Sequence, residues 1–182
     1  MSNIAVKGLV LMGGQSLRMG SDKAFVEYRN QTLLTHCLSQ LKGITSEVFL
    51  SVNAYQFEIL HGHYNCIQDR YPDKGPMGGI LSALETLNED LIVLAVDMPE
   101  VNHAMLSRLV LKGSKVKTYQ NQENQREPLP SFWPKTITKT LSSYFAKDQL
   151  SLNSFLKIHG EVVISDTDSG SFKNLNSPSD LI

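Results

Sequence analysis

Short apolar runs alternate with apolar stripes of helical spacing along most of this chain. Continuous apolar segments predict buried strands over residues 5–12, 47–52, 65–68, 91–96 and 161–164. Apolar side chains three and four positions apart predict helices over residues 33–41, 80–87, 105–111, 137–144 and 152–156, with a short helix over 56–62. The polar stretch 115–133 predicts a strand, an exposed loop and a second strand. This alternation is typical of α/β proteins, in which a parallel sheet carries helices on both faces.

Chemically useful residues follow directly after the predicted strands. Gly13 and Gly14 come after the first strand, Asn53 after the second, Asp69 after the third and Asp97 after the fourth. In an open parallel sheet, ligands bind at the carboxyl ends of the strands, where the order of the strands reverses. The pattern therefore predicts that these residues share one edge of the sheet and form one site.

The loop after the first strand has the chemistry of a phosphate site. It combines Gly13, Gly14 and Gly20 with Arg18 and Lys23. Glycine lets backbone N–H groups approach an anion, and the two cations match a polyphosphate. Five residues separate Gly14 from Gly20, and Lys23 comes three residues later, so neither the dinucleotide fingerprint nor the Walker loop fits. The alternative is a tight strand-to-helix turn without a ligand.

Asp97 lies at the mouth of the most apolar strand. An unpaired carboxylate is costly to bury there, whereas Mg²⁺ commonly binds one or two carboxylates together with phosphate oxygens. The alternative is that Asp97 caps the helix that follows Pro99. In the C-terminal tail, Asn174 and Asn176 could join a metal or phosphate network, ahead of a short predicted helix capped by Ser177.

Asp69 opens a second glycine-rich loop, which contains Gly75 and Gly78 and precedes the next predicted helix. Its carboxylate could accept hydrogen bonds from a guanine edge or from a ribose hydroxyl. Asn53 offers both a donor and an acceptor to the same ligand. The alternative for the Asp69 loop is an ordinary surface loop, and Asn53 taken alone is unremarkable.

Composition limits the class of protein. A chain of 182 residues predicts one domain over 1–182, and 41% hydrophobic with 19% charged residues is typical of a soluble globular protein. A net charge of −1 gives no basic field for nucleic acid. Cys37 and Cys66 are expected to be buried free thiols, which suits a reducing compartment. Because no signal peptide or membrane-length apolar run is present, we expect a cytoplasmic protein without membrane or nucleic-acid partners.

These motifs together resemble a known family. Residues 11–23 resemble the signature loop of nucleotidyltransferases that activate small phosphorylated molecules, and the chain looks most like the molybdenum cofactor guanylyltransferases. Asp69 with residues 75–79 is similar to that family's Asp…Gly-Pro-Leu-x-Gly loop. Residues 96–99, 127–129 and 174–178 resemble its Asp-x-Pro, Glu-Pro-Leu and Asn-x-Asn-Thr-Pro segments. Met12 stands where the family usually has alanine, and Ser177 where it has threonine.

The resemblance implies a Rossmann-like three-layer α/β/α fold with a mostly parallel sheet, and a role for each motif. Arg18, Lys23 and Asp97 would be catalytic, and Mg²⁺ would be the cofactor, bound by Asp97 with Asn174 and Asn176. The residues that would hold the nucleotide are Leu11, Met12, Gly13, Gly14, Lys23, Asn53, Asp69, Gly75, Gly78 and Asp97.

The implied reaction is guanylyl transfer from GTP to the phosphate of molybdopterin, with release of pyrophosphate. Other cofactor-assembly proteins are conceivable partners. Three alternatives stay open. The first is a related NTP transferase such as a molybdopterin cytidylyltransferase, the second a non-catalytic GTP-binding or carrier protein, and the third a structural member of an assembly complex.

Overall fold

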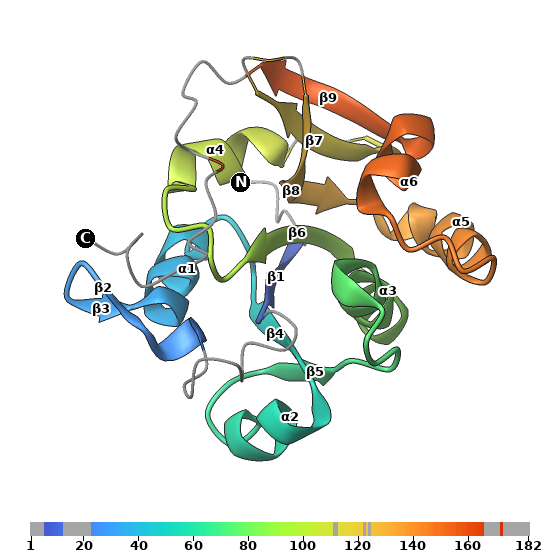
Figure 1. Cartoon of the computed structure of the whole chain (residues 1–182). Coiled ribbons are helices and arrows are strands. Elements are labelled where there is room, and N and C mark those ends of the chain that lie inside the picture. The colour runs from blue at the N-terminus through green and yellow to red at the C-terminus, as the bar shows by residue number, and fades with distance from the viewer. Residues whose placement is uncertain are drawn as a thin grey trace.

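A twisted sheet runs through the centre of the protein (Figure 1). The computed structural model describes residues 6–12, 23–110, 113–121, 123, 125–165 and 172. Within them, seven strands form one sheet in the order β5-β4-β1-β6-β8-β7-β9. Their bounds are β1 (Val6–Leu11), β4 (Val48–Val52), β5 (Cys66–Gln68), β6 (Asp90–Ala95), β7 (Val116–Gln120), β8 (Arg126–Trp133) and β9 (Gly160–Ser165).

The sheet is mostly parallel. β1 pairs in parallel with both β4 and β6, β4 with β5, and β7 with β9. β8 alone runs the other way, because it is antiparallel to both of its neighbours, β6 and β7. The apolar runs in β1 and β6 are almost wholly buried, as expected of strands covered on both faces. The predicted α/β class and mostly parallel sheet are confirmed.

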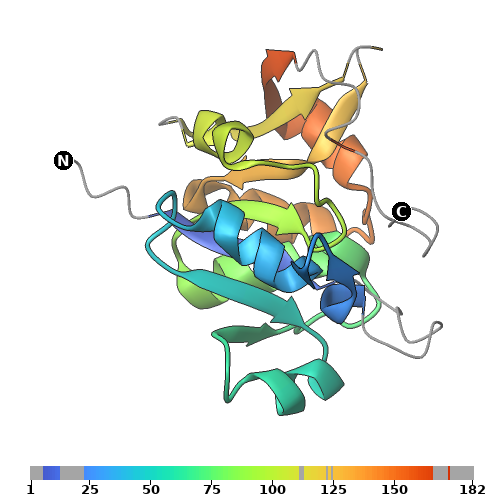
Figure 2. The same cartoon turned by 90° about the vertical axis from the view of Figure 1, so that its left-hand side faces the viewer.

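Helices cover both faces of the sheet, which gives three layers (Figures 1 and 2). α1 (Leu33–Leu41) and α4 (His103–Leu109) lie on one face, and α3 (Gly75–Leu87), α5 (Thr138–Phe145) and α6 (Leu152–His159) on the other. α2 (Ala54–Leu60) packs against β4 and β5 at one end of the sheet. Short 3₁₀ segments precede α1 and α5, as η2 (Lys23–Phe25) and η3 (Lys135–Ile137). No helix among the described residues is long and apolar enough to cross a membrane.

Apart from shifts of up to three residues at the ends of elements, two local features differ from the sequence prediction. α3 begins at Gly75 rather than after Gly79, so Gly78 and Gly79 are inside the helix. Gly75 itself has a φ of +64°, which favours glycine where the loop turns into the helix. The other difference is a small hairpin of β2 (Glu27–Tyr28) and β3 (Gln31–Thr32), which the apolar pattern does not predict.

The order of the strands creates a switch point between β1 and β6. From β1 the chain proceeds outward through β4 to β5, and it then returns across the sheet to β6 on the opposite side of β1. Crevices at the carboxyl ends of two such strands are the usual ligand sites of open α/β sheets. The segments after Leu11 and Ala95 therefore occupy the position where a ligand is expected.

Candidate active site

Hydrogen bonds continue the sheet beyond the ends of its strands. The Met12 N–H donates to the Ser51 carbonyl at 3.2 Å, and the Val96 N–H donates to the Leu11 carbonyl at 3.0 Å. The Met12 side chain is only 1% exposed and belongs to the core. The side chain of Met12 therefore packs in the core, while its backbone extends the edge of the sheet.

Lys23 and Asp97 meet at the switch point. The Lys23 ammonium donates to Oδ2 of Asp97 at 3.1 Å, and the two side chains are 22% and 23% exposed. Lys23 opens η2, and Asp97 lies in the turn that follows β6. The alternative role of Asp97 as a helix cap is wrong, because α4 begins at His103 and Asn102 caps it by accepting from the Met105 N–H at 3.1 Å.

Asp97 suits a divalent cation that arrives with a nucleotide. Among the described residues, no three carboxylate, histidine or cysteine side chains form a ready-made metal cluster. An ion that takes most of its ligands from phosphate oxygens and water needs only one or two protein carboxylates. A partly exposed carboxylate beside a lysine therefore fits a metal bound mainly through a polyphosphate.

The thiol of Cys37 lies close behind this turn. Cys37 is fully buried in α1, and its Sγ donates to the Val96 carbonyl at 3.6 Å. Burial, followed by the negative charge of Asp97, raises the pKa of Cys37 to about 12. The thiol therefore stays protonated at neutral pH and acts as a packing group rather than a nucleophile. Both cysteines are free as predicted, but Cys66 is half-buried rather than buried.

Asp69 is held at the end of β5 by its own loop. Its Oδ1 accepts from the Tyr71 N–H at 2.8 Å and from the Ser82 hydroxyl at 3.1 Å. The same hydroxyl accepts from the Arg70 N–H at 3.0 Å, which ties the loop to α3. Within the described part of the chain both bonds to Asp69 fall on Oδ1.

Asn53 and Gly78, which are predicted to bind the nucleotide, also have structural roles. Asn53 caps α2 by accepting from the Gln56 N–H at 2.8 Å, and Gln56 returns the bond in a capping box. At Gly78, a Cβ would lie 2.9 Å from the Tyr71 carbonyl oxygen, so glycine is required for the loop to pack on the helix. Their contacts with a nucleotide stay predictions.

Several predicted site residues lie outside the described residues. They are Gly13, Gly14, Arg18, Asn174 and Asn176, together with the predicted helix capped by Ser177. The switch point therefore brings together Leu11, Met12, Lys23 and Asp97, while Asn53, Asp69 and Gly75 lie along the same edge of the sheet, after β4 and β5.

The sequence prediction missed a group of residues that contact the turn after Asp97. Tyr28 and Arg29 of the small hairpin both bond Glu100, and His36 of α1 bonds the Pro99 carbonyl. The only signal was Asn30, a residue that tolerates left-handed backbone, in the turn between β2 and β3. No glycine marks that turn.

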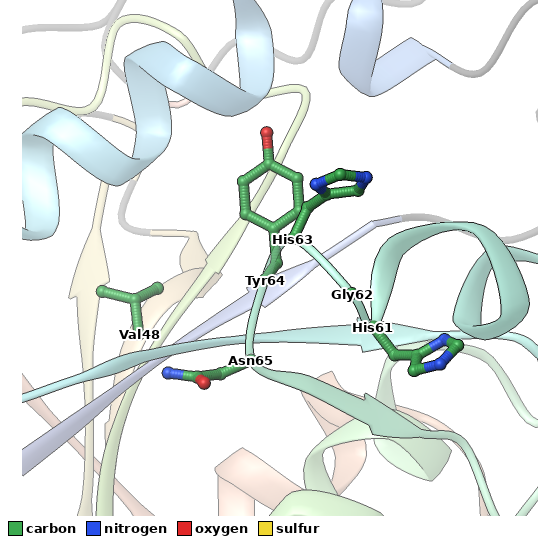
Figure 3. Close-up of a pocket in the computed structure, with 6 residues that line it drawn as sticks. All are labelled: Val48, His61, Gly62, His63, Tyr64 and Asn65. Carbon is green, nitrogen blue, oxygen red and sulfur yellow. The ribbon is translucent and has the colours of Figure 1, made fainter.

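A shallow pocket of about 400 Å³ lies at the opposite edge of the sheet. It is lined by Val48, His61, Gly62, His63, Tyr64 and Asn65, where β4 and β5 begin. In Figure 3 the rings of His61 and His63 point away from each other, so they do not converge on a shared ligand. Both histidines are exposed, as predicted from the sequence.

The switch point, with its lysine–aspartate pair and the neighbouring Asp69 loop, has the position and the chemistry expected of an α/β protein that binds a phosphorylated ligand such as a nucleotide. Residues 8–162 match the model of the MobA-like NTP transferase domain. The chain belongs to the MobA-like NTP transferase family.

Relatives extend over nearly the whole chain. The molybdenum cofactor guanylyltransferase of Haemophilus influenzae is 27% identical over 185 residues, covering 98% of this chain and 96% of that protein. The crystal structure of molybdopterin-guanine dinucleotide biosynthesis protein A from Archaeoglobus fulgidus has a TM-score of 0.78 at 24% identity, covering 96% and 94% of the two chains. A Mycobacterium tuberculosis protein solved in complex with manganese has a TM-score of 0.63 at 16% identity and covers 90% of each chain. These structures share the fold.

Proposed function

We propose that this protein transfers a guanylyl group from GTP to the phosphate of molybdopterin, releasing pyrophosphate and forming molybdopterin guanine dinucleotide. The observation that carries the proposal is the Lys23–Asp97 pair at the switch point of a MobA-like NTP transferase domain. The near full-length likeness to a molybdenum cofactor guanylyltransferase supports the choice of nucleotide and acceptor.

The reaction makes modest demands on the protein. A phosphate oxygen of molybdopterin attacks the α-phosphorus of GTP, a new P–O bond forms, and the bond between the α-phosphorus and the bridging oxygen breaks as pyrophosphate leaves. The nucleophile is already anionic near pH 7, because the second pKa of a phosphate monoester is about 6. No protein general base is needed, so the protein has to align two polyanions and offset their repulsion.

Lys23 is suited to that task. Its ammonium lies at the carboxyl edge of β1, at the end of the loop predicted to hold phosphates, and it is only 22% exposed. A cation that is partly shielded from water and already positioned stabilises developing negative charge more strongly than a mobile surface lysine. In the described structure Asp97 is its partner, and a bound triphosphate would compete for the same ammonium.

Asp97 would hold Mg²⁺, with Asn174 and Asn176 as further predicted ligands. When bound, the ion would neutralise charge on the phosphate oxygens of the nucleotide. Asp97 also keeps Lys23 at the switch point through their ion pair at 3.1 Å. The same carboxylate can therefore serve the cation and the lysine that a polyphosphate requires.

The test is pyrophosphate release measured with each nucleoside triphosphate, in the presence of molybdopterin and Mg²⁺. We expect release with GTP, and a loss of about 100-fold or more in turnover for Lys23→Ala and for Asp97→Ala with the fold intact, as for removal of one preorganised electrostatic group. Lys135→Ala is the matched control, because it removes an exposed ion pair with Glu89 at the opposite end of β6. This control should retain wild-type turnover.

Each contrary result has a distinct meaning. Preferential release with CTP would replace the guanylyl assignment with cytidylyl transfer. Tight GTP binding without pyrophosphate release would indicate a carrier protein. Near-normal kinetics in Asp97→Ala would remove Asp97 from the metal site.

A further inference from the structure

The turn that carries Asp97 is held by hydrogen bonds at both of its ends. On the β6 side, the Met98 N–H donates to the Ala95 carbonyl at 3.3 Å. On the far side, Nε2 of His36 lies 2.8 Å from the Pro99 carbonyl oxygen. The turn is thus held by the end of β6 at one side and by a side chain of α1 at the other.

The hydrogen bonds of His36 settle which ring nitrogen donates. A carbonyl oxygen can only accept, so Nε2 carries the proton and donates to Pro99. Nδ1 then accepts from the Gln31 side-chain amide at 3.2 Å. His36 is 9% exposed, and its ring meets that of Tyr28 edge to face, with centroids 5.4 Å apart. His36 is therefore fixed in orientation by contacts on three sides.

The small hairpin extends this brace by one residue. The Tyr28 hydroxyl donates to Oε1 of Glu100 at 2.6 Å, and Nη2 of Arg29 donates to the same oxygen at 3.1 Å. Burial and the bond to Glu100 raise the pKa of Tyr28 to about 12, so its hydroxyl keeps its proton across the neutral range. The hairpin and α1 thus hold consecutive residues, Pro99 and Glu100, just beyond Asp97.

We propose that His36 is a positioning residue for Asp97. By holding the Pro99 carbonyl, it sets the direction in which Asp97 presents its carboxylate to Lys23 and to a cation bound with the nucleotide. The inference rests on the proposed function, because it concerns the same site. His36 itself touches neither the substrate nor the metal, and it acts only through the turn.

The test compares three replacements at His36. His36→Phe keeps a ring but removes the donor to Pro99. His36→Gln extends an amide nitrogen to the position of Nε2 and is the rescue variant. His36→Asn reaches only the position of Nδ1, and it provides a second variant without the donor if the phenylalanine protein fails to fold.

The main readout is the affinity for Mn²⁺ in the presence of GTP, measured from the electron paramagnetic resonance signal of free Mn²⁺. Loss of a residue bonded directly to a metal ligand typically weakens binding 10- to 100-fold. Because His36 bonds the turn two residues beyond Asp97, the lower end of that range applies. We expect about ten-fold weaker binding in His36→Phe and His36→Asn, and affinity within about two-fold of wild type in His36→Gln. Thermal melting of each variant reports its fold separately.

His61→Phe is the matched control. Nδ1 of His61 lies 2.7 Å from the Phe57 carbonyl, so this change also removes a histidine–carbonyl hydrogen bond and keeps a ring. It does so beside the pocket of Figure 3, at the opposite edge of the sheet. We expect its Mn²⁺ affinity to equal that of the wild type.

Two negative results are distinguishable. If wild type binds Mn²⁺ with GTP and both donor-less variants bind it equally well, the positioning role of His36 is overturned while the proposed function stands. If the wild-type protein fails to bind Mn²⁺ in the presence of any nucleoside triphosphate, the proposed function is overturned. The positioning role of His36, which rests on that function, is then overturned as well.

Discussion

Ser82 holds together the loop that presents Asp69, and its removal gives a sharp test of that part of the edge. Ser82 lies in α3 and is fully buried. Its hydroxyl donates to Oδ1 of Asp69 at 3.1 Å and accepts from the Arg70 N–H at 3.0 Å. Ser82→Ala deletes both bonds and leaves the backbone of α3 unchanged.

The size of the effect follows from these two bonds. A hydrogen bond to a charged group contributes about 1.5–3 kcal/mol, and a neutral one about 1 kcal/mol. The higher helix propensity of alanine offsets about 0.5 kcal/mol of this loss in the free energy of unfolding. Asp69 is half-exposed, so water replaces part of its lost bond. We therefore expect a loss of about 2 kcal/mol in the free energy of unfolding, and a fall in Tm of about 4–8 °C for a chain of this size.

Urea unfolding of Ser82→Ala, Asp69→Ala and the double variant measures the coupling directly. If the hydroxyl and the carboxylate act together, the double variant loses less stability than the two single variants combined, by about 1 kcal/mol or more. The affinity for GTP should fall about five-fold in Ser82→Ala, because the carboxylate gains rotamer freedom that binding must remove.

Ser154→Ala is the control. Its hydroxyl is exposed on α6 and bonds only the neighbouring Ser151 hydroxyl among the described residues, at 3.1 Å. We expect a change within about 0.5 kcal/mol. A loss below that size in Ser82→Ala, or additive losses in the cycle with Asp69→Ala, would refute the reasoning about this loop.

Two further predictions concern the caps of two helices and a buried thiol. Asn53→Ala and Asn102→Ala each remove the cap of a seven-residue helix, and each should cost about 1 kcal/mol in urea unfolding. If Asn53 also binds the nucleotide, only Asn53→Ala should weaken GTP binding in a titration, and equal affinities would remove it from the site. The pKa of Cys37 is raised from 9.0 to about 12, so the folded state keeps a proton that the unfolded chain releases. The stability that this proton contributes is present below pH 9 and is lost toward pH 12. Between these values the free energy of unfolding should therefore fall with pH more steeply for wild type than for Cys37→Ala, by about 1.4 kcal/mol per pH unit. Parallel pH profiles would contradict the buried thiol.

The hydrophobic pattern was enough to predict the sheet. The apolar run at 91–96 became β6, one residue earlier than predicted, because buried parallel strands need apolar side chains on both faces. The start of α3 could not be predicted in the same way. Gly78 and Gly79 resemble a loop in sequence, yet they are needed inside the helix, where a Cβ on Gly79 would collide with the Ser51 hydroxyl of β4. That close approach exists only in the folded protein.

The sequence predicted only those parts of the site that lie directly after strands. Asp97 and Asp69 follow strands in the sequence, so their shared edge follows from the fold class. The contact between Lys23 and Asp97 joins residues 74 positions apart, and no spacing rule reports it. His36 was hidden for a different reason. It lies on the buried face of α1, where its bond to the Pro99 carbonyl cannot be told from ordinary core packing.

The two described residues that flank the glycine-rich loop explain why its departure from the family pattern is tolerable. Met12 and Lys23 bracket residues 13–22, and both are tied to the switch point. Met12 is bonded through its backbone to β4, and Lys23 is paired with Asp97 after β6. Because the Met12 side chain is packed in the core, replacing alanine with methionine enlarges the core rather than the ligand's side of the loop. If the loop that begins at Asp69 contacts the base, as predicted, substitutions there should change nucleotide selectivity more than substitution of Met12.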